Sequence, residues 1–241
     1  MKPVEKLLIV ANWKMNPGSS KEAWDLAEGI KKGVAEVQDA KVVLCPPFVF
    51  MPQILPTGNV ELGSQDCFWE NQGAFTGEVS PSMLKNLGCS YVILGHSERK
   101  NNLGETLEMV NKKVKAALAA GLNAVVCIGE KLEREMREVL KDIAQEQAQK
   151  LVLVYEPEWA ISTNKGAAPA TPENCGRAIE LIRKVAKEMF GDIQIPILYG
   201  GSTNSKNIKG FIESGAQGAL VGSTSLDAQE FIELVRNAAM V

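Results

Sequence analysis

Histidine and paired cysteines are what the 241-residue sequence has least of. It contains one histidine, His96, and five cysteines that are scattered along the chain: Cys45, Cys67, Cys89, Cys127 and Cys175. An odd number of cysteines without paired spacing argues against a disulfide framework and against a zinc site. The sequence therefore predicts no bound metal and a reducing, cytoplasmic environment.

Long apolar runs and a strong net charge are also absent. No run approaches the roughly 18 apolar residues that a membrane span needs. The first residues, MKPVEKLLIV, have a short apolar part and an early acidic residue, which is not typical of a signal peptide. The net charge of -3 gives no reason to expect nucleic acid or an anionic membrane as a partner.

Short runs rich in apolar residues alternate with longer amphipathic segments. Most of the runs are continuously apolar, which is typical of strands buried on both faces of a parallel sheet. The eight expected strands are LLIVA (7–11), KVVLC (41–45), VELGS (60–64), YVIL (91–94), AVVCI (124–128), LVLVY (151–155), IPILY (195–199) and GALVG (218–222).

The segments between these runs have helical periodicity and helix-end signals. The first opens on Ser20 as the expected N-cap, and another closes at Gly121. A third has Thr171 as N-cap, Pro172 at its first helical position and Gly191 as its stop. We therefore expect helices between the strands.

The order of the elements favours a single α/β domain over residues 1–241, with the fold of a (β/α)8 barrel. The sequence has no linker and no break in composition. The alternative is a doubly wound open sheet, which usually has fewer strands and a glycine-rich turn after the first one. Here the first strand continues into Asn12-Trp13-Lys14, without that turn.

In such a barrel, chemistry takes place in the loops that follow the strands. Residues suited to chemistry do follow five of the expected strands. They are Asn12 and Lys14 after the first, His96 and Glu98 after the fourth, Glu156 after the sixth, Gly200-Gly201-Ser202 after the seventh, and Gly222-Ser223 after the eighth. The single histidine is thus expected at a common mouth of the barrel.

Each of these residues has a plainer interpretation when it is taken alone. His96 is then a surface or core-edge residue, Lys14 a solvated lysine and Glu156 a salt-bridge partner. The glycines are then turn residues. Their occurrence at the same ends of different strands favours one shared site.

Six motifs extend this hypothesis: NWKMN, GAFTGEVS, LGHSER, CIGE, YEPEWAI and YGGS. In order and spacing they resemble the triosephosphate isomerase family, from Asn12 to about Leu226. The resemblance implies a TIM barrel that forms a homodimer. It also implies an isomerase of glycolysis and gluconeogenesis that interconverts dihydroxyacetone phosphate and D-glyceraldehyde 3-phosphate without a cofactor.

The resemblance implies a role for each candidate residue, and these roles are the established ones of that family. Glu156 would be the base that moves the carbon proton. His96, held neutral by the helix that follows GHSER, would be the electrophile facing the enediolate oxygens. Lys14 and Asn12 would stabilise the developing charge. Glu98 would support this network without touching the substrate.

Phosphate binding is expected at the last two strands and in the loop after Glu156, which closes over the substrate as a lid in the family. The matching positions are Ser162 in the lid, Ser202, and the Gly222-Ser223 pair. Backbone N–H groups commonly bind phosphate in such loops.

The lid is also where the sequence departs from the family. The family's lid is close to EPVWAIGTGK, whereas residues 156–165 of this chain are EPEWAISTNK. Ser162 and Asn164 replace glycines, Glu158 brings a charge into the first hinge, and Ser223 replaces a glycine in the last loop. These changes bear on how phosphate is held and how the lid closes.

A long segment after the third strand, QDCFWENQGAFTGEVS (65–80), contains Phe68, Trp69 and Phe75. A long loop in a compact domain is usually functional, and exposed aromatic residues commonly mark an interface. The resemblance implies that this loop reaches the second subunit, with Thr76 near the other active site. The alternative is that the aromatic residues fold back onto their own barrel.

Three functions remain open at this point. The first is the isomerisation of triose phosphates. The second is the isomerisation of another short sugar phosphate, such as a tetrulose phosphate, for which the altered lid is the supporting feature. The third is a barrel that binds or scaffolds without catalysis. The presence of all four catalytic residue types argues against the third, and the sequence favours the first.

Overall fold

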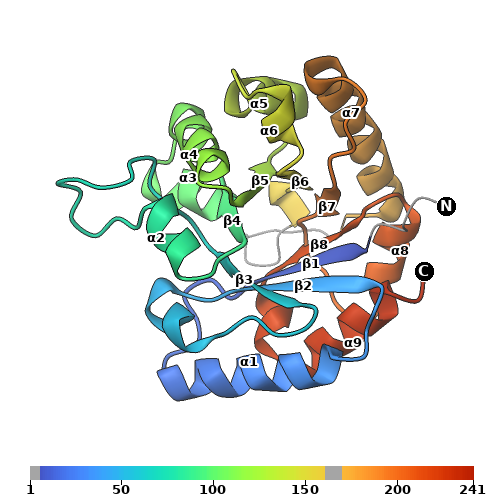
Figure 1. The fold of residues 1–241 in the computed structure, drawn as a ribbon. Coiled ribbons are helices and arrows are strands. Elements are labelled where there is room, and N and C mark those ends of the chain that lie inside the picture. The colour runs from blue at the N-terminus through green and yellow to red at the C-terminus, as the bar shows by residue number, and fades with distance from the viewer. Residues whose placement is uncertain (1–5, 161–169) are drawn as a thin grey trace.

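The computed structural model describes residues 6–160 and 170–241, apart from the side chain of Glu158. Parallel strands form a closed barrel in which each strand is hydrogen-bonded to the next and β8 to β1 (Figure 1). The strands are β1 (Leu7–Asn12), β2 (Ala40–Cys45), β3 (Val60–Ser64), β4 (Tyr91–Leu94), β5 (Asn123–Ile128), β6 (Leu151–Tyr155), β7 (Ile197–Tyr199) and β8 (Gly218–Val221). The closed order confirms the (β/α)8 barrel and excludes the open doubly wound sheet.

Helices lie outside the barrel and connect its strands (Figure 1). They are α1 (Ser20–Val34), α2 (Pro81–Asn86), α3 (Ser97–Leu103), α4 (Leu107–Ala119), α5 (Leu132–Val139), α6 (Gln145–Ala148), α7 (Pro172–Phe190), α8 (Ile208–Glu213) and α9 (Ala228–Ala238), with the 3-10 helices η1 (Phe48–Gln53), η2 (Glu158–Ala160) and η3 (Ser223–Leu226). None of the helices in the described ranges combines the length and apolar character that crossing a membrane requires.

All eight expected strands are present, with ends that differ from the expected ones by at most two residues. The largest difference is in β7, which begins at Ile197 and not at Ile195. Pro196 has no N–H group to donate to a strand ladder, so the run IPILY pairs only through its last three residues.

The predicted N-cap of α1 is wrong by one residue. The helix begins at Ser20, and the capping side chain is that of Ser19, whose oxygen accepts the N–H of Glu22. Ser19 has the extended backbone that an N-cap needs, whereas Ser20 is already helical. For α7, the predicted Thr171 cap and Gly191 stop are both confirmed.

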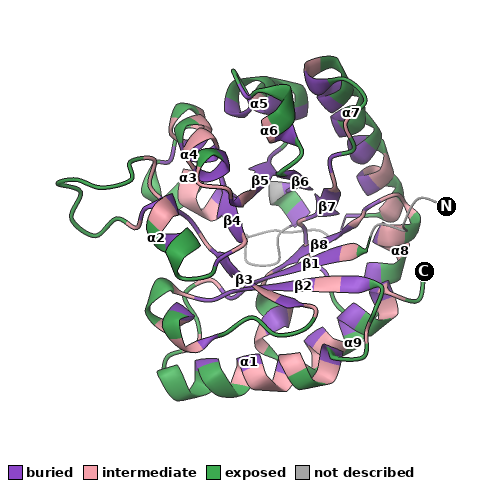
Figure 2. Ribbon diagram, viewed as in Figure 1, coloured by how far each residue is buried: buried purple, intermediate pink, exposed green. Residues whose placement is uncertain are grey.

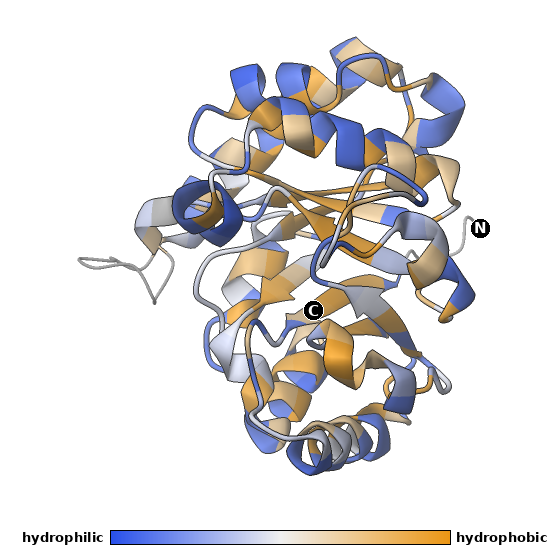
Figure 3. Ribbon diagram, turned by 90° about the vertical axis from the view of Figure 1, so that its left-hand side faces the viewer, coloured by the Kyte–Doolittle hydropathy of each residue, from blue (hydrophilic) through white to orange (hydrophobic). Residues whose placement is uncertain are grey.

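The core has two parts, inside and outside the barrel. The interior is filled by side chains from alternate strand positions, among them Val10, Val43, Ile93 and Val154. The outer strand faces pack against the apolar sides of the helices, which expose their other sides to solvent (Figure 2). The strands are accordingly apolar along most of their length, while the helices carry hydrophilic outer faces (Figure 3).

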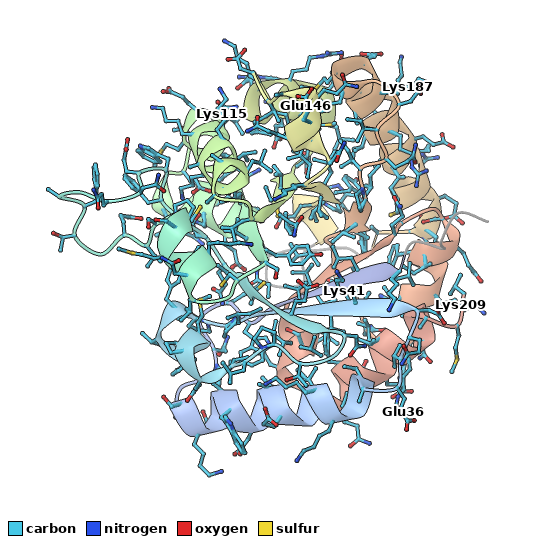
Figure 4. All side chains as sticks on the ribbon, viewed as in Figure 1. Glu36, Lys41, Lys115, Glu146, Lys187 and Lys209 are labelled. Carbon is cyan, nitrogen blue, oxygen red and sulfur yellow. The ribbon has the colours of Figure 1, made fainter. Side chains whose placement is uncertain are left out.

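Most charged side chains point away from this core. Glu36, Lys115, Lys187 and Lys209 extend outward from the helical ring (Figure 4). The interior thus contains few ionisable groups, and those that are buried at the mouth of the barrel stand out.

Candidate active site

A cavity of about 270 Å³ opens at the C-terminal ends of the strands. Asn12, Lys14, His96 and Glu156 line it together with the residues after the last two strands: Gly200, Gly201, Ser202, Gly222 and Ser223. In the structure, the expected catalytic residues and most of the expected phosphate-binding residues therefore line the same cavity. Ser162 lies outside the described residues.

Glu156 follows β6 and is fully buried. Its carboxylate accepts two hydrogen bonds from Ser97, one from the backbone N–H at 3.0 Å and one from the hydroxyl at 2.8 Å. Its Oε1 atom also lies 3.2 Å from Nε2 of His96. The first turn of α3 therefore holds the anion that the sequence assigns as the base.

His96 lies between β4 and α3, where Gly95 turns the chain with φ +70°. The Nδ1 atom of the imidazole accepts the backbone N–H of Glu98 at 3.2 Å. A ring nitrogen that accepts a hydrogen bond carries no proton, so the proton of this ring belongs to Nε2, which faces Glu156. This geometry fits a neutral imidazole that donates toward the cavity.

The loop after β1 is fixed in an uncommon backbone conformation. Lys14 has φ +54°, which is rare for a residue with a side chain. The side-chain oxygen of Asn12 accepts the Lys14 N–H at 3.0 Å, and Gln65 donates to the carbonyls of Lys14 and Cys45 at 2.7 and 2.9 Å. These bonds direct the lysine side chain into the cavity.

The Lys14 ammonium lies between an acid and the phosphate end of the cavity. Its Nζ is 2.5 Å from Oε1 of Glu98. A Cβ atom added to Gly222 would lie only 3.3 Å from Cε of Lys14, so the glycine leaves room for this side chain. Glu98 thus touches Lys14 and is not among the residues that line the cavity.

Gly200 and Gly201 are required by close contacts and are more than turn residues. A Cβ atom at Gly200 would lie 2.5 Å from Cγ1 of Val154, and one at Gly201 would lie 2.1 Å from the hydroxyl of Tyr199. Ser202 follows them, and both its N–H and its hydroxyl donate to the carbonyl of Ala160, at 3.1 and 2.8 Å. This end of the cavity is therefore built from exposed backbone and hydroxyl groups.

Comparison with known proteins gives a single result. The family model described as Triosephosphate isomerase matches residues 7–238. The chain belongs to the triosephosphate isomerase family. The triosephosphate isomerase of Dehalococcoides mccartyi is 41% identical over 257 aligned positions that cover 99% of each chain. That of Caldanaerobacter subterraneus subsp. tengcongensis is 43% identical over 249 positions, which cover 95% of this chain and 98% of the relative.

Membership of the triosephosphate isomerase family confirms the resemblance of the six motifs.

Two residues at the site had no role assigned to them from the sequence. Ser97, inside LGHSER, holds Glu156, and Gln65 holds the backbone of Lys14. The position of Ser97 beside His96 at a helix start was a usable signal, because the first N–H groups of a helix bind anions. Nothing near Gln65 in the sequence indicated that its side chain would donate to the carbonyl of Lys14.

Burial raises the pKa of the Cys127 thiol well above its ordinary value, and the neighbouring Glu156 carboxylate raises it further. The thiol therefore stays protonated next to the base. It fills space in the barrel interior and is not a nucleophile.

A group of four charges, buried except for the partly exposed Arg99, connects the site to the elements around it. Lys113 on α4 lies 2.8 Å from both carboxylate oxygens of Asp66 and also contacts Glu105. Arg99 on α3 lies 2.9 Å from Asp66 and 3.3 Å from Glu105. Burial raises the pKa of Asp66, and the two cations oppose that shift. We call these four residues the charge cluster; it joins the segment after β3 to the two helices that follow β4.

No three His, Cys, Asp or Glu side chains within residues 6–160 and 170–241 are grouped closely enough to hold a metal ion.

The segment 65–80 projects from the body of the barrel (Figure 1). Its aromatic rings pack on one another: Phe68 stacks on Trp69 with centroids 4.0 Å apart and lies 4.7 Å from Phe75. Lys112 on α4 lies over the Trp69 ring. Phe75 and Thr76 remain exposed, so the aromatic group is anchored to the barrel at its base and open at its tip.

Proposed function

We propose that the protein interconverts dihydroxyacetone phosphate and D-glyceraldehyde 3-phosphate through an enediolate. The observation that supports this most directly is the arrangement of one cavity. A buried carboxylate, a neutral imidazole and an ammonium group line it together, beside loops of exposed backbone suited to phosphate. This reaction places it in glycolysis and gluconeogenesis, and it needs no cofactor, since only protons move.

Glu156 is the proposed base. In the structure its carboxylate is bound by Ser97 and faces His96. A substrate oxygen that accepts the Nε2 proton of His96 replaces Glu156 at that atom, which frees the carboxylate to remove a proton from the adjacent carbon. The same carboxyl group then returns the proton to the neighbouring carbon, which completes the isomerisation.

His96 is the proposed electrophile. Because its Nδ1 accepts the Glu98 N–H, the ring presents a single N–H donor to the two oxygens of the enediolate. A neutral donor is a closer match in acidity to these oxygens than an imidazolium would be. The ring therefore stabilises the intermediate and moves a proton between its oxygens.

Lys14 and Asn12 are the proposed electrostatic stabilisers. The ammonium supplies a positive charge that is already in place when the enediolate forms, so no reorganisation is needed at that moment. Asn12 holds the backbone of Lys14 and, as a residue of the cavity wall, orients a substrate oxygen.

The phosphate group is proposed to bind at Ser202, Gly222 and Ser223, together with the backbone N–H of Ser162. Ser202 currently donates twice to the carbonyl of Ala160, which directly precedes the lid segment. A phosphate that takes over these donors releases Ala160. Phosphate binding is thereby coupled to movement of the lid, which protects the enediolate from water and from loss of phosphate.

We further propose that the chain is one domain and forms a cytoplasmic homodimer. Large apolar side chains are exposed in the segments that follow the first four strands: Met15, Val49, Phe75 and Leu103. Exposed apolar groups gathered on one region commonly mark an interface. Thr76, at the tip of the projecting loop, is proposed to support Lys14 and Asn12 of the other subunit.

The test is turnover of glyceraldehyde 3-phosphate and of erythrulose 4-phosphate side by side, each with the same enzyme preparation. We expect the triose phosphate to be converted with a kcat/KM about a hundredfold higher, since one extra carbon in a fitted cavity changes kcat/KM by roughly 10–200-fold. A preference for the four-carbon substrate would replace the proposal with the tetrulose phosphate alternative. No turnover of either would leave only a binding barrel.

A further inference from the structure

An ion pair outside the cavity joins α3 to α5. The Nζ atom of Lys100 lies 3.2 Å from Oε2 of Glu135, and only 14% and 13% of the two side chains are exposed. Neither residue is among those that line the cavity, and neither belongs to the charge cluster. An ion pair that is largely removed from water is by itself weak evidence of stabilisation. Its other contacts therefore indicate what the pair holds in place.

Glu135 fixes the loop that follows β5. Its Oε2 atom accepts the N–H of Gly129 at 3.0 Å, and its Oε1 atom accepts the N–H of Lys131 at 3.4 Å. A Cβ atom added to Gly129 would lie 2.9 Å from Oε1, so the glycine lets the carboxylate come this close. Ile128, directly before Gly129, accepts the backbone N–H of Glu156 at 2.9 Å. Glu135 thereby fixes the strand end to which the backbone of the proposed base is bound.

Lys100 belongs to the first turn of α3. Its backbone N–H donates to the carbonyl of His96 at 3.2 Å. The same turn contains Ser97, whose N–H and hydroxyl hold the Glu156 carboxylate. Burial lowers the pKa of Lys100, but the Glu135 carboxylate and, less strongly, Glu156 raise it, and the net shift is upward. The ammonium is therefore charged and interacts with both carboxylates.

Glu156 is thus held from two elements, its backbone by the end of β5 and its carboxylate by the start of α3. We propose that Lys100 and Glu135 are positioning residues for Glu156, because their ion pair fixes these two elements relative to each other. This inference rests on the proposed function. Proton transfer is sensitive to a displacement of about an ångström, whereas the pair lies outside the residues that bind the substrate. Its loss should therefore lower kcat and leave KM nearly unchanged.

The experiment compares wild-type protein with Lys100→Met and Glu135→Ala. The readouts are kcat and KM for glyceraldehyde 3-phosphate, and the dissociation constant for inorganic phosphate by calorimetry. We expect each variant to lower kcat by about tenfold or more, with KM and the phosphate dissociation constant within about twofold of wild type. The double variant should lose less than the product of the two single losses, because the two side chains act as a unit.

Two further variants separate positioning from a general loss of structure. Lys100→Arg keeps the cation opposite Glu135 and should recover most of the kcat that Lys100→Met loses. Glu133→Ala, on the same helix, breaks an exposed ion pair with Arg137 and should change neither kcat nor phosphate affinity. If Glu135→Ala does not fold, Glu135→Gln, which keeps an acceptor for the Gly129 N–H, takes its place.

A wild-type kcat in both Lys100→Met and the Glu135 variant would overturn the inference. So would a parallel loss of kcat and phosphate affinity, since the whole cavity and not the base would then be disturbed. A kcat of Lys100→Arg as low as that of Lys100→Met would also contradict it. Failure of the proposed function is a different result: wild-type protein that isomerises no triose phosphate, in which case the inference falls with it.

Discussion

Glu156 and Lys14 both have a partner before any substrate is bound. The carboxylate accepts the N–H and hydroxyl of Ser97, and the ammonium pairs with Glu98. A polar group taken out of water needs hydrogen-bond partners, because its contacts with water are otherwise lost without replacement. The two contacts therefore hold both side chains in place until a substrate provides other partners.

The Lys14–Glu98 contact leads to a prediction about Glu98→Gln. The amide keeps the size of the side chain but removes the charge opposite Lys14, so the ammonium is less well fixed toward the cavity. We expect kcat/KM for glyceraldehyde 3-phosphate to fall by about tenfold or more, since misplacement of a catalytic group is costly. Steady-state kinetics measures this loss.

The control for that variant is Asp25→Asn, which breaks an exposed ion pair with Lys21 on α1. It should leave kcat/KM and Tm as in the wild type. Equal activity of Glu98→Gln and wild type would mean that Glu98 is not needed to position Lys14.

The sequence predicted which residues would share the site but not how they are held. His96, Glu156 and Lys14 could be selected because each follows an apolar strand, and parallel strands end on the same side. Ser97 meets Glu156 across 59 positions, and Gln65 meets Lys14 across 51. Such contacts depend on side-chain directions and on the register between strands, neither of which is visible in a local pattern.

At the scale of elements, the charge cluster holds α3 and α4 to the segment after β3. Asp66, Glu105 and Lys113 are nearly inaccessible to solvent. A buried ion pair is weak evidence of net stabilisation, but removal of one partner leaves an uncompensated charge. The cluster therefore makes the position of α3, which contains Ser97 and Glu98, sensitive to changes outside the cavity.

The variant Lys113→Met tests whether the charge cluster stabilises the fold. The variant removes the cation that faces Asp66 and Glu105, and it should lower the free energy of unfolding by about 3–5 kcal/mol. Urea denaturation followed by circular dichroism gives the value. Lys112→Met, at the preceding position of α4, removes a partly exposed lysine and should lower the free energy of unfolding much less. A similar small loss in both variants would contradict a structural role for the cluster.

The elements themselves were largely predictable. Seven strands end within one residue of the expected positions, because continuous apolar runs suit strands covered on both sides. The exceptions have local causes that outweigh the pattern: Pro196 shortens β7, and the choice between two adjacent serines for the cap of α1 depends on backbone angles. The lid segment 161–169 lies outside the described residues, so its predicted contacts stay predictions.

For the whole molecule, the proposed homodimer gives a prediction about mass and activity. The exposed tip of segment 65–80 at Phe75 and Thr76 is expected to be covered by a second chain. Sedimentation at micromolar concentration should give a dimer, and Phe75→Glu should give monomers of much lower kcat, because a charge there is unfavourable in an apolar contact. A fully active monomer of the wild-type protein would contradict the proposal.

The five buried thiols predict how stability depends on pH. Burial raises the pKa of Cys89 to about 12 and that of Cys175 to about 11, and it also raises the pKa values of Cys45, Cys67 and Cys127. In the unfolded chain thiols ionise near pH 8.5. Above about that pH the unfolded state loses protons that the folded state keeps, so the free energy of unfolding should fall.

The expected slope is about 1.4 kcal/mol per pH unit for each thiol between its unfolded and folded pKa. Thermal unfolding from pH 7 to pH 10.5 measures it, and below pH 8 the thiols should contribute no slope. Cys175→Ala should show a shallower decline than wild type. A Tm that stays constant up to pH 10.5 would contradict this account.

In the proposed reaction, Glu156 moves the proton between the two carbons of a triose phosphate. The most direct measurement is kcat and KM for glyceraldehyde 3-phosphate in wild-type protein and in Glu156→Asp. The shorter side chain withdraws the carboxylate by about an ångström, so kcat should fall by about a hundredfold while KM changes far less. A Glu156→Asp variant that keeps the wild-type kcat would remove Glu156 from the mechanism and contradict the account.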